Sequence, residues 1–134
     1  MLLTFLKLCA IAFWMVSALH LVFGMGSEAM LGAHLGEATL TDPTLNSQNR
    51  FYGVAFALYG VVFWMSAADF ARYRPMLLAA LWLFFAAGVA RLLAFALHGW
   101  PTPAVVALGL IELIGTPLLL LWILRFRPTN LARD

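Results

Sequence analysis

Four apolar stretches, each about as long as a bilayer is thick, restrict what this chain can fold into. They cover approximately residues 3–25, 50–70, 75–97 and 103–124, and a helix needs about 20 predominantly apolar residues to cross the hydrocarbon core. Only 10% of the residues are charged, against about 25% in an ordinary soluble domain. A soluble domain of this size has too little interior to bury so much apolar surface. The sequence therefore predicts one all-α membrane domain over residues 1–134, an antiparallel four-helix bundle.

The breaks between these stretches contain prolines and charged residues. We expect Pro75 and Pro103 to open the third and fourth helices, because proline suits a first helical position, where its missing N–H would lack a partner anyway. Links this short make successive helices antiparallel neighbours. The one long connection is the loop at residues 26–49. Its first part, "GSEAMLGAHLG" (residues 26–36), is apolar enough to predict a short helix that lies at the outer surface and partly caps the bundle.

The first apolar stretch also has features of a signal peptide. Lys7 is followed by an apolar run, and Val16-Ser17-Ala18 imitates a cleavage site. The apolar run nevertheless continues to Met25, which is long enough to span a bilayer. This length favours a retained helix, with a cleaved signal as the alternative.

The distribution of cations predicts how the bundle is oriented. The loop at residues 26–49 contains Glu28, Glu37 and Asp42 but no Lys or Arg. The cations lie instead at the amino terminus, in the second connection or in the carboxyl-terminal tail, and they include Lys7, Arg72, Arg74, Arg125, Arg127 and Arg133. By the positive-inside rule, both termini are cytoplasmic and the long loop faces outward.

Arg91 stands inside the third apolar stretch. An arginine there costs from roughly 3 kcal/mol on insertion scales to over 10 in simulations. With the orientation above, Arg91 lies roughly 9 Å and Glu112 roughly 13 Å below the outer ends of adjacent helices, at 1.5 Å per residue. We expect the two to form a bidentate pair, with Arg50 or His20 one further hydrogen-bonded step away. The alternatives are that Arg91 snorkels to the headgroups or that the pair is only structural.

Four other polar residues share the outer half of the predicted bundle. Arg50 is expected in the first turn of the second helix, where the helix dipole disfavours a cation and an anion is needed nearby. His98 follows Arg91 by seven residues and so projects from the same face. Thr116 precedes Pro117, which should bend the fourth helix. The candidate ligand-binding residues are therefore His20, Arg50, Arg91, Glu112, His98 and Thr116. Each of these residues alone could be an anchor at the membrane interface or an interior side chain with its hydrogen bonds satisfied. The prediction of a site therefore rests on their similar depth in the membrane.

Sequence signatures of catalysis are scarce. The chain has no Gly-rich phosphate loop, nucleophile elbow or thiol pair, and its single cysteine, Cys9, excludes an internal disulfide. The pair His34 and Glu37 is a very weak metal signal, so we predict no metal site and assign no cofactor. A formal net charge of +2 is too small and too dispersed to indicate nucleic acid.

Several segments together resemble a known family. They are "NRFYGVAFALYG" (residues 49–60), "RYRP" (72–75), "ARLLAFALHGWPTP" (90–103) and "IELIGTP" (111–117). These segments are similar to a bacterial family of small four-helix membrane proteins of unknown function, with a distant likeness to DoxX proteins. The family-like positions are Asn49, Arg50, Gly53, Arg91, Gly99, Pro103 and Glu112. The resemblance supports the fold and carries over no activity.

These observations predict a multi-pass protein of the bacterial inner membrane with a polar site in its outer half. We expect an accessory or ligand-binding role, in which the site holds a small lipophilic or amphiphilic molecule, or a partner subunit of a larger complex or homo-oligomer. The alternatives are a membrane-embedded enzyme, with His20 and Glu112 as acid and base in isomerase-like chemistry, or a small transporter. Whether the chain is an enzyme stays open.

The cation distribution gives a first testable prediction. A reporter enzyme that works only in the cytoplasm should be active when it is fused after Arg127. A reporter enzyme that works only outside the cytoplasm should be active when it is inserted within residues 26–49. Periplasmic activity of the fusion after Arg127 would contradict the predicted orientation, as would a mature protein that begins at Leu19.

Overall fold

The chain folds into helices in a computed structural model that describes residues 1–126. Four helical spans are long and apolar enough to cross a membrane. The first three are α1 (Leu2–Phe23), α4 (Pro43–Ala68) and α5 (Phe70–His98). The fourth, Pro103–Arg125, is called the fourth span below. The predicted all-α, multi-pass membrane protein in contact with a lipid bilayer is confirmed.

The fourth span has three parts. They are α6 (Pro103–Leu110), a π-helical turn η1 (Ile111–Gly115) and α7 (Thr116–Arg125). Two short helices, α2 (Gly26–Met30) and α3 (Glu37–Thr41), lie in the long connection between α1 and α4. Arg127 and Arg133 lie outside the described residues.

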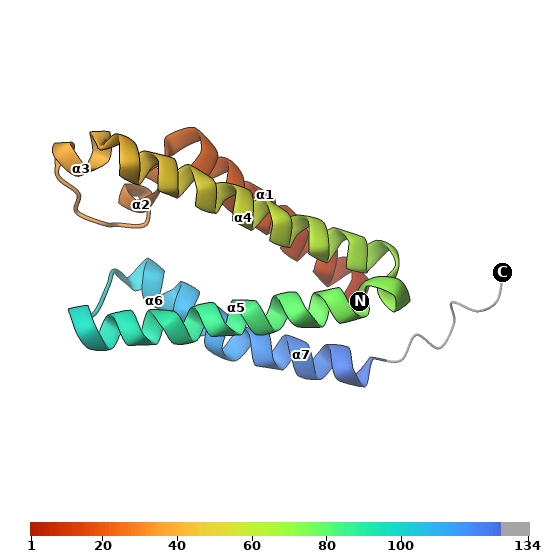
Figure 1. The fold of residues 1–134 in the computed structure, drawn as a ribbon. Helices are drawn as coiled ribbons and strands as arrows, with labels where there is room; N and C mark the ends of the chain where they lie inside the picture. Colours follow the sequence, from red (N-terminus) through yellow and green to blue (C-terminus); the bar gives the residue numbers. More distant parts are fainter. Residues whose placement is uncertain (127–134) are drawn as a thin grey trace.

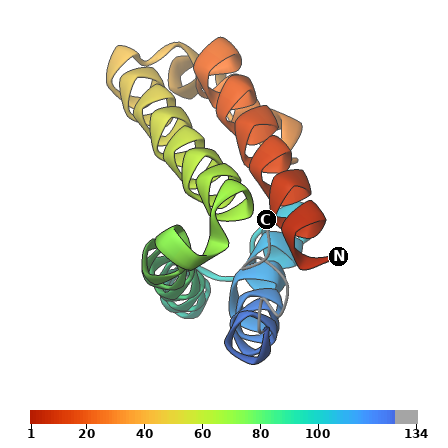
Figure 2. The ribbon, with the colours of Figure 1, turned by 90° about the vertical axis from the view of Figure 1, so that its right-hand side faces the viewer.

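The spans form two pairs that diverge from one end of the molecule. Helix α1 packs along α4, and α5 packs against the fourth span. The pairs meet where α4 turns into α5, near the amino terminus and the end of α7, and they separate toward the end that carries α2 and α3 (Figure 1). Seen along the helices, α1 and α4 form one layer and α5 and the fourth span form the other (Figure 2).

The hydrophobic core lies where the two pairs meet. It draws on all four spans, and its buried members include Leu2, Leu6, Ala10, Phe63, Ala67, Phe70, Leu77, Leu81, Leu120 and Ile123. These residues come from the beginnings of α1 and α5 and from the ends of α4 and α7. The opposite end of the bundle is therefore not filled by this core.

Helix α4 begins seven residues before the predicted boundary at residue 50, and that boundary is wrong. The side chain of Asp42 caps the helix by accepting a hydrogen bond from the backbone N–H of Leu45 at 2.8 Å. Pro43 occupies the first helical position, which favours initiation there. Arg50 therefore lies beyond the first turn, contrary to the prediction.

The start of the third span is also earlier than predicted. Helix α5 begins at Phe70, with Pro75 inside it. The carboxylate of Asp69 accepts a hydrogen bond from the backbone N–H of Arg72 at 3.1 Å and so caps the helix. A charged turn was expected before Pro75, but only Asp69 separates α4 from α5. An aspartate cap can start a helix upstream of the proline.

The predicted short helix in the long connection is confirmed for Gly26–Met30, the first part of the stretch. It is shorter than expected, and α3 was not predicted. The carbonyl of Leu31 accepts a hydrogen bond from the hydroxyl of Thr102 at 2.7 Å. The connection is thus attached both to the α1–α4 pair and to the start of the fourth span.

Two glycines of α4, Gly53 and Gly60, let α1 approach closely. A Cβ at Gly53 would lie 3.1 Å from both the carbonyl oxygen of Ser17 and the Cβ of His20. A Cβ at Gly60 would overlap the indole of Trp14. The close α1–α4 contact therefore depends on small residues, as is typical of helix packing in membranes.

The Trp14–Gly60 contact gives a second prediction. Gly60→Ala should lower the free energy of unfolding in detergent by about 1–3 kcal/mol, the usual cost of overpacking. In a Trp14→Ala background the same substitution should cost much less, because the obstructing ring is gone. Gly36→Ala is the control, since a Cβ there has no neighbour within 4 Å. Equal penalties in both backgrounds would show that Trp14 does not pack against Gly60.

Candidate functional site

Arg91 and Glu112 form the predicted ion pair between α5 and η1, but the expected bidentate geometry is wrong, because a single guanidinium nitrogen contacts the carboxylate. Arg91 Nε donates to Glu112 Oε2 at 2.8 Å. The glutamate side chain is only 5% exposed, whereas that of Arg91 is 33% exposed. The pair therefore places one charge inside the protein and leaves part of the other accessible.

Gly88 allows this pair to form. It lies nearly one turn before Arg91 on α5, and a Cβ there would stand 2.8 Å from the Cβ of Glu112 and 2.9 Å from Cγ of Leu113. Any larger residue would force α5 and η1 apart. Glycine at this position thus brings the carboxylate within reach of the guanidinium.

Glu112 lies in a π-helical turn. The backbone N–H of Thr116 bonds to the carbonyl of Ile111, five residues back, and the hydroxyl of Thr116 lies 3.3 Å from the same oxygen. Pro117 follows directly and has no N–H to continue the α-helical pattern. The structure accommodates Pro117 with this widened turn, a feature often found at functional sites.

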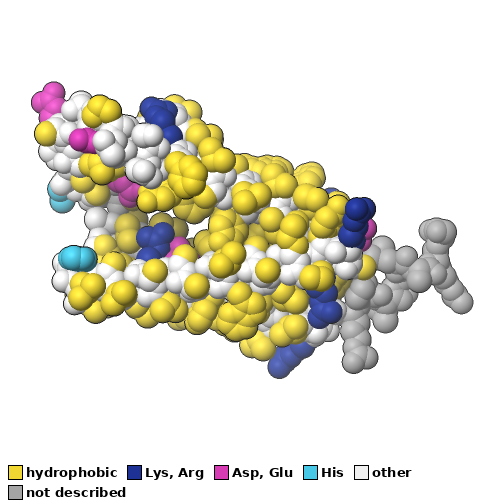
Figure 3. Space-filling model, viewed as in Figure 1, with side chains coloured by type: hydrophobic (Ala, Val, Ile, Leu, Met, Phe, Trp, Pro, Cys, Tyr) yellow, Lys and Arg dark blue, Asp and Glu magenta, His cyan; other side chains and the backbone are white. Residues whose placement is uncertain are grey.

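The terminal nitrogens of Arg91 are free to bind something else. Within residues 1–126, Nε is the only Arg91 nitrogen that has a hydrogen-bonding partner. The surface is hollowed between the two helix pairs at the end that carries α2 and α3, and a Lys or Arg side chain lies there beside an acidic one (Figure 3). Glu112 therefore holds Arg91 by one nitrogen and leaves Nη1 and Nη2 available.

An apolar cavity of about 280 Å³ lies between α1 and the fourth span. Its walls come from all four spans and contain four phenylalanines and one hydroxyl side chain, that of Thr116. The lining residues are Phe5, Cys9, Ala12, Phe13, Val16, Phe63, Leu81, Phe84, Leu108, Ile111, Gly115, Thr116 and Leu119. Leu108 and Ile111 are neighbours of Glu112 on the helix, so the cavity and the ion pair belong to one region.

Tyr59 packs against two aromatic residues of the cavity wall, and it was not among the candidate residues predicted from the sequence. Its ring is stacked on Phe13 at a centroid distance of 5.3 Å and lies 5.6 Å from Phe84, and both of these residues line the cavity. A usable signal was present, because a tyrosine within a membrane span needs a partner for its hydroxyl.

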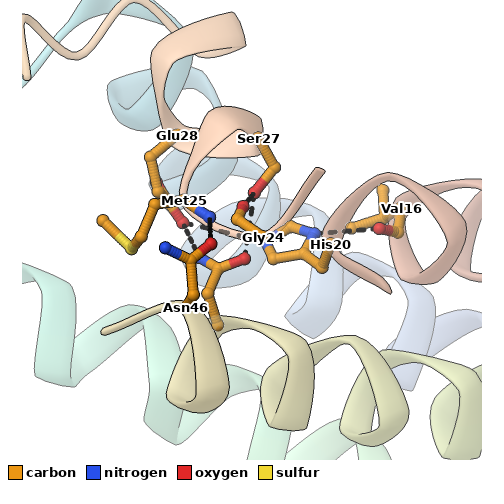
Figure 4. Close-up of polar contacts among 8 residues, drawn as sticks. Val16, His20, Gly24, Met25, Ser27, Glu28 and Asn46 are labelled. Atoms are coloured by element: carbon orange, nitrogen blue, oxygen red, sulfur yellow. Dashed lines mark hydrogen bonds and ion pairs between the residues drawn. The ribbon is translucent and has the colours of Figure 1, made fainter. Parts of the chain in front are cut away.

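A second polar group, the α2 cluster, lies where α1 ends and α2 begins (Figure 4). It consists of His20, Ser27, Glu28, Asn46 and Asn49. The Nδ1 of His20 lies 2.9 Å from the carbonyl oxygen of Val16. Since that oxygen only accepts, Nδ1 carries the hydrogen. The Nε2 of His20 faces Glu28 Oε1 at 3.7 Å.

The rest of the α2 cluster connects α2 to α4. Asn49 donates to Glu28 Oε1 at 3.0 Å, and the hydroxyl of Ser27 lies 3.1 Å from Asn49 Oδ1. Asn46 accepts from the backbone N–H of Met25 at 3.1 Å. Ser27 and Asn49 are buried. The cluster therefore fixes α2 against the α1–α4 pair.

The expected hydrogen bond that would link the ion pair to Arg50 or His20 is absent among the described residues. Arg50 donates to the carbonyl of Leu21, and His20 contacts Val16 and Glu28. His98, in the last turn of α5, is exposed. The candidates thus divide between the two helix pairs, with Arg91, Glu112 and Thr116 on one and His20 and Arg50 on the other. Within residues 1–126, no three His, Cys, Asp or Glu side chains are grouped so that they could hold a metal ion.

Comparison with known proteins gives a family and no activity. The family model described as "Domain of unknown function (DUF4345)" matches residues 1–123. No curated protein and no solved structure matches the chain. The match confirms the resemblance to a family of unknown function, while the distant likeness to DoxX proteins stays a prediction.

The ion pair gives a third prediction. Arg91→Leu or Glu112→Leu alone should lower the free energy of unfolding by about 3–5 kcal/mol, because each leaves a charge without its partner. Replacing both should cost far less. Arg72→Leu, at an exposed cation, is the control and should change stability little. Additive losses in the double variant, measured by unfolding in mixed micelles, would show that the pair does not form.

Proposed function

The chain belongs to the DUF4345 family, and from this premise we propose that it is a membrane-embedded binding protein for a small lipophilic or amphiphilic molecule. The molecule would lie between the two helix pairs, with its apolar part in the cavity and its polar part toward Arg91. We further propose that the protein is an inner-membrane protein of a bacterium, with both termini in the cytoplasm and α2 on the outer side.

The observation that carries this proposal is an apolar cavity whose lining includes Leu108 and Ile111, neighbours along the helix of Glu112, the partner of Arg91. The backbones of α1 and the fourth span come close at few points, and the space between these two elements is lined almost entirely by apolar side chains. Arg91 follows the lining residue Phe84 by seven positions on α5, about 10 Å along the helix. An apolar chamber with a few polar groups at one side is the usual form of a small-molecule site.

The volume limits what the site can hold. At about 280 Å³, the cavity lies at the lower end of the roughly 300–1,000 Å³ typical of ligand pockets. It has room for a ring system or a short chain. A complete two-chain phospholipid would not fit, so the proposal concerns a smaller molecule.

The charges at the two ends of the bundle support the proposed orientation. Lys7, Arg72, Arg74 and Arg125 belong to the end where the pairs meet. Glu28, Glu37 and Asp42 belong to the other end, which also carries Arg50. The cation-rich end is the expected cytoplasmic side, and in the proposed orientation Arg91 and Glu112 would lie in the outer half.

The alternatives have no comparable support. His20 and Glu112 have different partners and lie on different helix pairs, so an acid–base couple between them has no geometric basis. Four spans around one small cavity enclose no continuous path of the kind a transporter needs. A partner subunit in the hollow is the remaining alternative, and the experiment below distinguishes it.

Filling the cavity gives a fourth prediction. Protein extracted gently from its membrane should carry a small molecule that native mass spectrometry detects as added mass. Ala12→Phe places a ring in the cavity and should abolish that added mass. Ala18→Phe, on the same helix and outside the lining residues, is the matched control and should retain it.

Two results would contradict the proposed function. One is the same bound mass in Ala12→Phe as in the unmodified chain, because the molecule would then lie elsewhere. The other is a protein partner in place of a small molecule, displaced by Ala12→Phe and retained by Ala18→Phe.

A further inference from the structure

We propose that the site selects a flat, uncharged ring compound that bears a carbonyl oxygen, the chemistry of a quinone or a cyclic enone. This inference rests on the proposed function and names the class of ligand. It follows from three properties of the site: its aromatic walls, its unpartnered donors and its charge balance.

The walls of the cavity favour a flat ring. Phe5, Phe13, Phe63 and Phe84 all line it. The ring of Phe13 lies 5.3 Å from that of Phe63 and 5.4 Å from that of Phe84, tilted against the first and edge-on to the second. Aromatic side chains in such arrangements present both faces and edges to a planar guest.

The polar groups near the cavity favour an acceptor. Tyr59 is packed on Phe13 and Phe84, and its hydroxyl has no hydrogen-bonding partner within residues 1–126. The Nη1 and Nη2 groups of Arg91 are also unpartnered there and can only donate. A ligand that offers an oxygen acceptor satisfies these donors, whereas a pure hydrocarbon leaves them unsatisfied.

The charge balance favours a neutral acceptor over an anion. Glu112 already neutralises Arg91 across 2.8 Å and is itself buried. A carboxylate or phosphate at the free nitrogens of Arg91 would bring a second negative charge close to Glu112 in a medium of low dielectric constant, where like charges repel strongly. A carbonyl oxygen accepts the same hydrogen bonds without that repulsion, so a fatty acid is the less suitable ligand.

Three probes with related rings test separately whether the site prefers a carbonyl oxygen, a hydrocarbon or an anion. Menadione carries two carbonyls on a methylated naphthalene ring, 2-methylnaphthalene has the ring without oxygen, and 1-naphthoate carries a carboxylate. Binding to the full chain in detergent micelles would be measured by calorimetry, with the heat of probe-free and protein-free micelles subtracted. We expect menadione to bind at least about tenfold more tightly than either of the others, since one good hydrogen bond corresponds to about that factor.

A conservative variant tests the donor directly. Tyr59→Phe keeps the ring and removes the hydroxyl, so it should weaken menadione binding about three- to tenfold and leave 2-methylnaphthalene binding unchanged. Tyr52→Phe is the matched control, because Tyr52 lies on the same helix, is exposed and does not line the cavity. It should alter neither probe.

The outcomes distinguish this inference from the proposed function. Equal binding of menadione and 2-methylnaphthalene, both lost in Ala12→Phe, would overturn the ligand class and leave the binding function standing. Tightest binding of 1-naphthoate would likewise overturn the neutral class. Binding of all three probes that is unaffected by Ala12→Phe would overturn both proposals, because the cavity would then not be the site.

Discussion

The ion pair between Arg91 and Glu112 is the interaction on which the arrangement of this protein depends. Either charge alone within a membrane span is costly, and the pair offsets this cost by joining α5 to η1 at 2.8 Å. Gly88 removes the side chain that would otherwise keep the helices apart. The result is a tightly held α5–fourth-span pair in which one guanidinium still has donors to offer.

The α1–α4 pair is held by different means, and the contrast produces the hollow between the pairs. Gly53 and Gly60 allow close contact between α1 and α4, and the α2 cluster fixes the connection between these two helices. Each pair is therefore packed internally, while the backbones of α1 and the fourth span come close at few points. The apolar cavity adjoins the main core, because Phe63 and Leu81 belong to both, and it extends to Ile111, the residue before Glu112.

Much of this could be predicted from the sequence, and the failures have identifiable causes. Hydropathy located the spans, and depth along antiparallel helices predicted the Arg91–Glu112 pair. The start of α4 was missed because residues 43–49 are polar, although Asp42 and Pro43 together are a helix-start signal. Depth also placed His20 and Arg50 beside the ion pair, but depth says nothing about lateral position. Only tertiary packing showed that they belong to the other helix pair and that Tyr59 lies at the site.

Exchange of the two charges measures the central interaction most directly. Arg91→Glu and Glu112→Arg would each place two like charges together in the bundle, and the double exchange would restore an opposite pair. Stability of the three variants in the same micelles gives the coupling energy between the positions. The account predicts that the double variant is markedly more stable than either single variant. Additive destabilisation would contradict it, because the two side chains would then not face each other within the membrane.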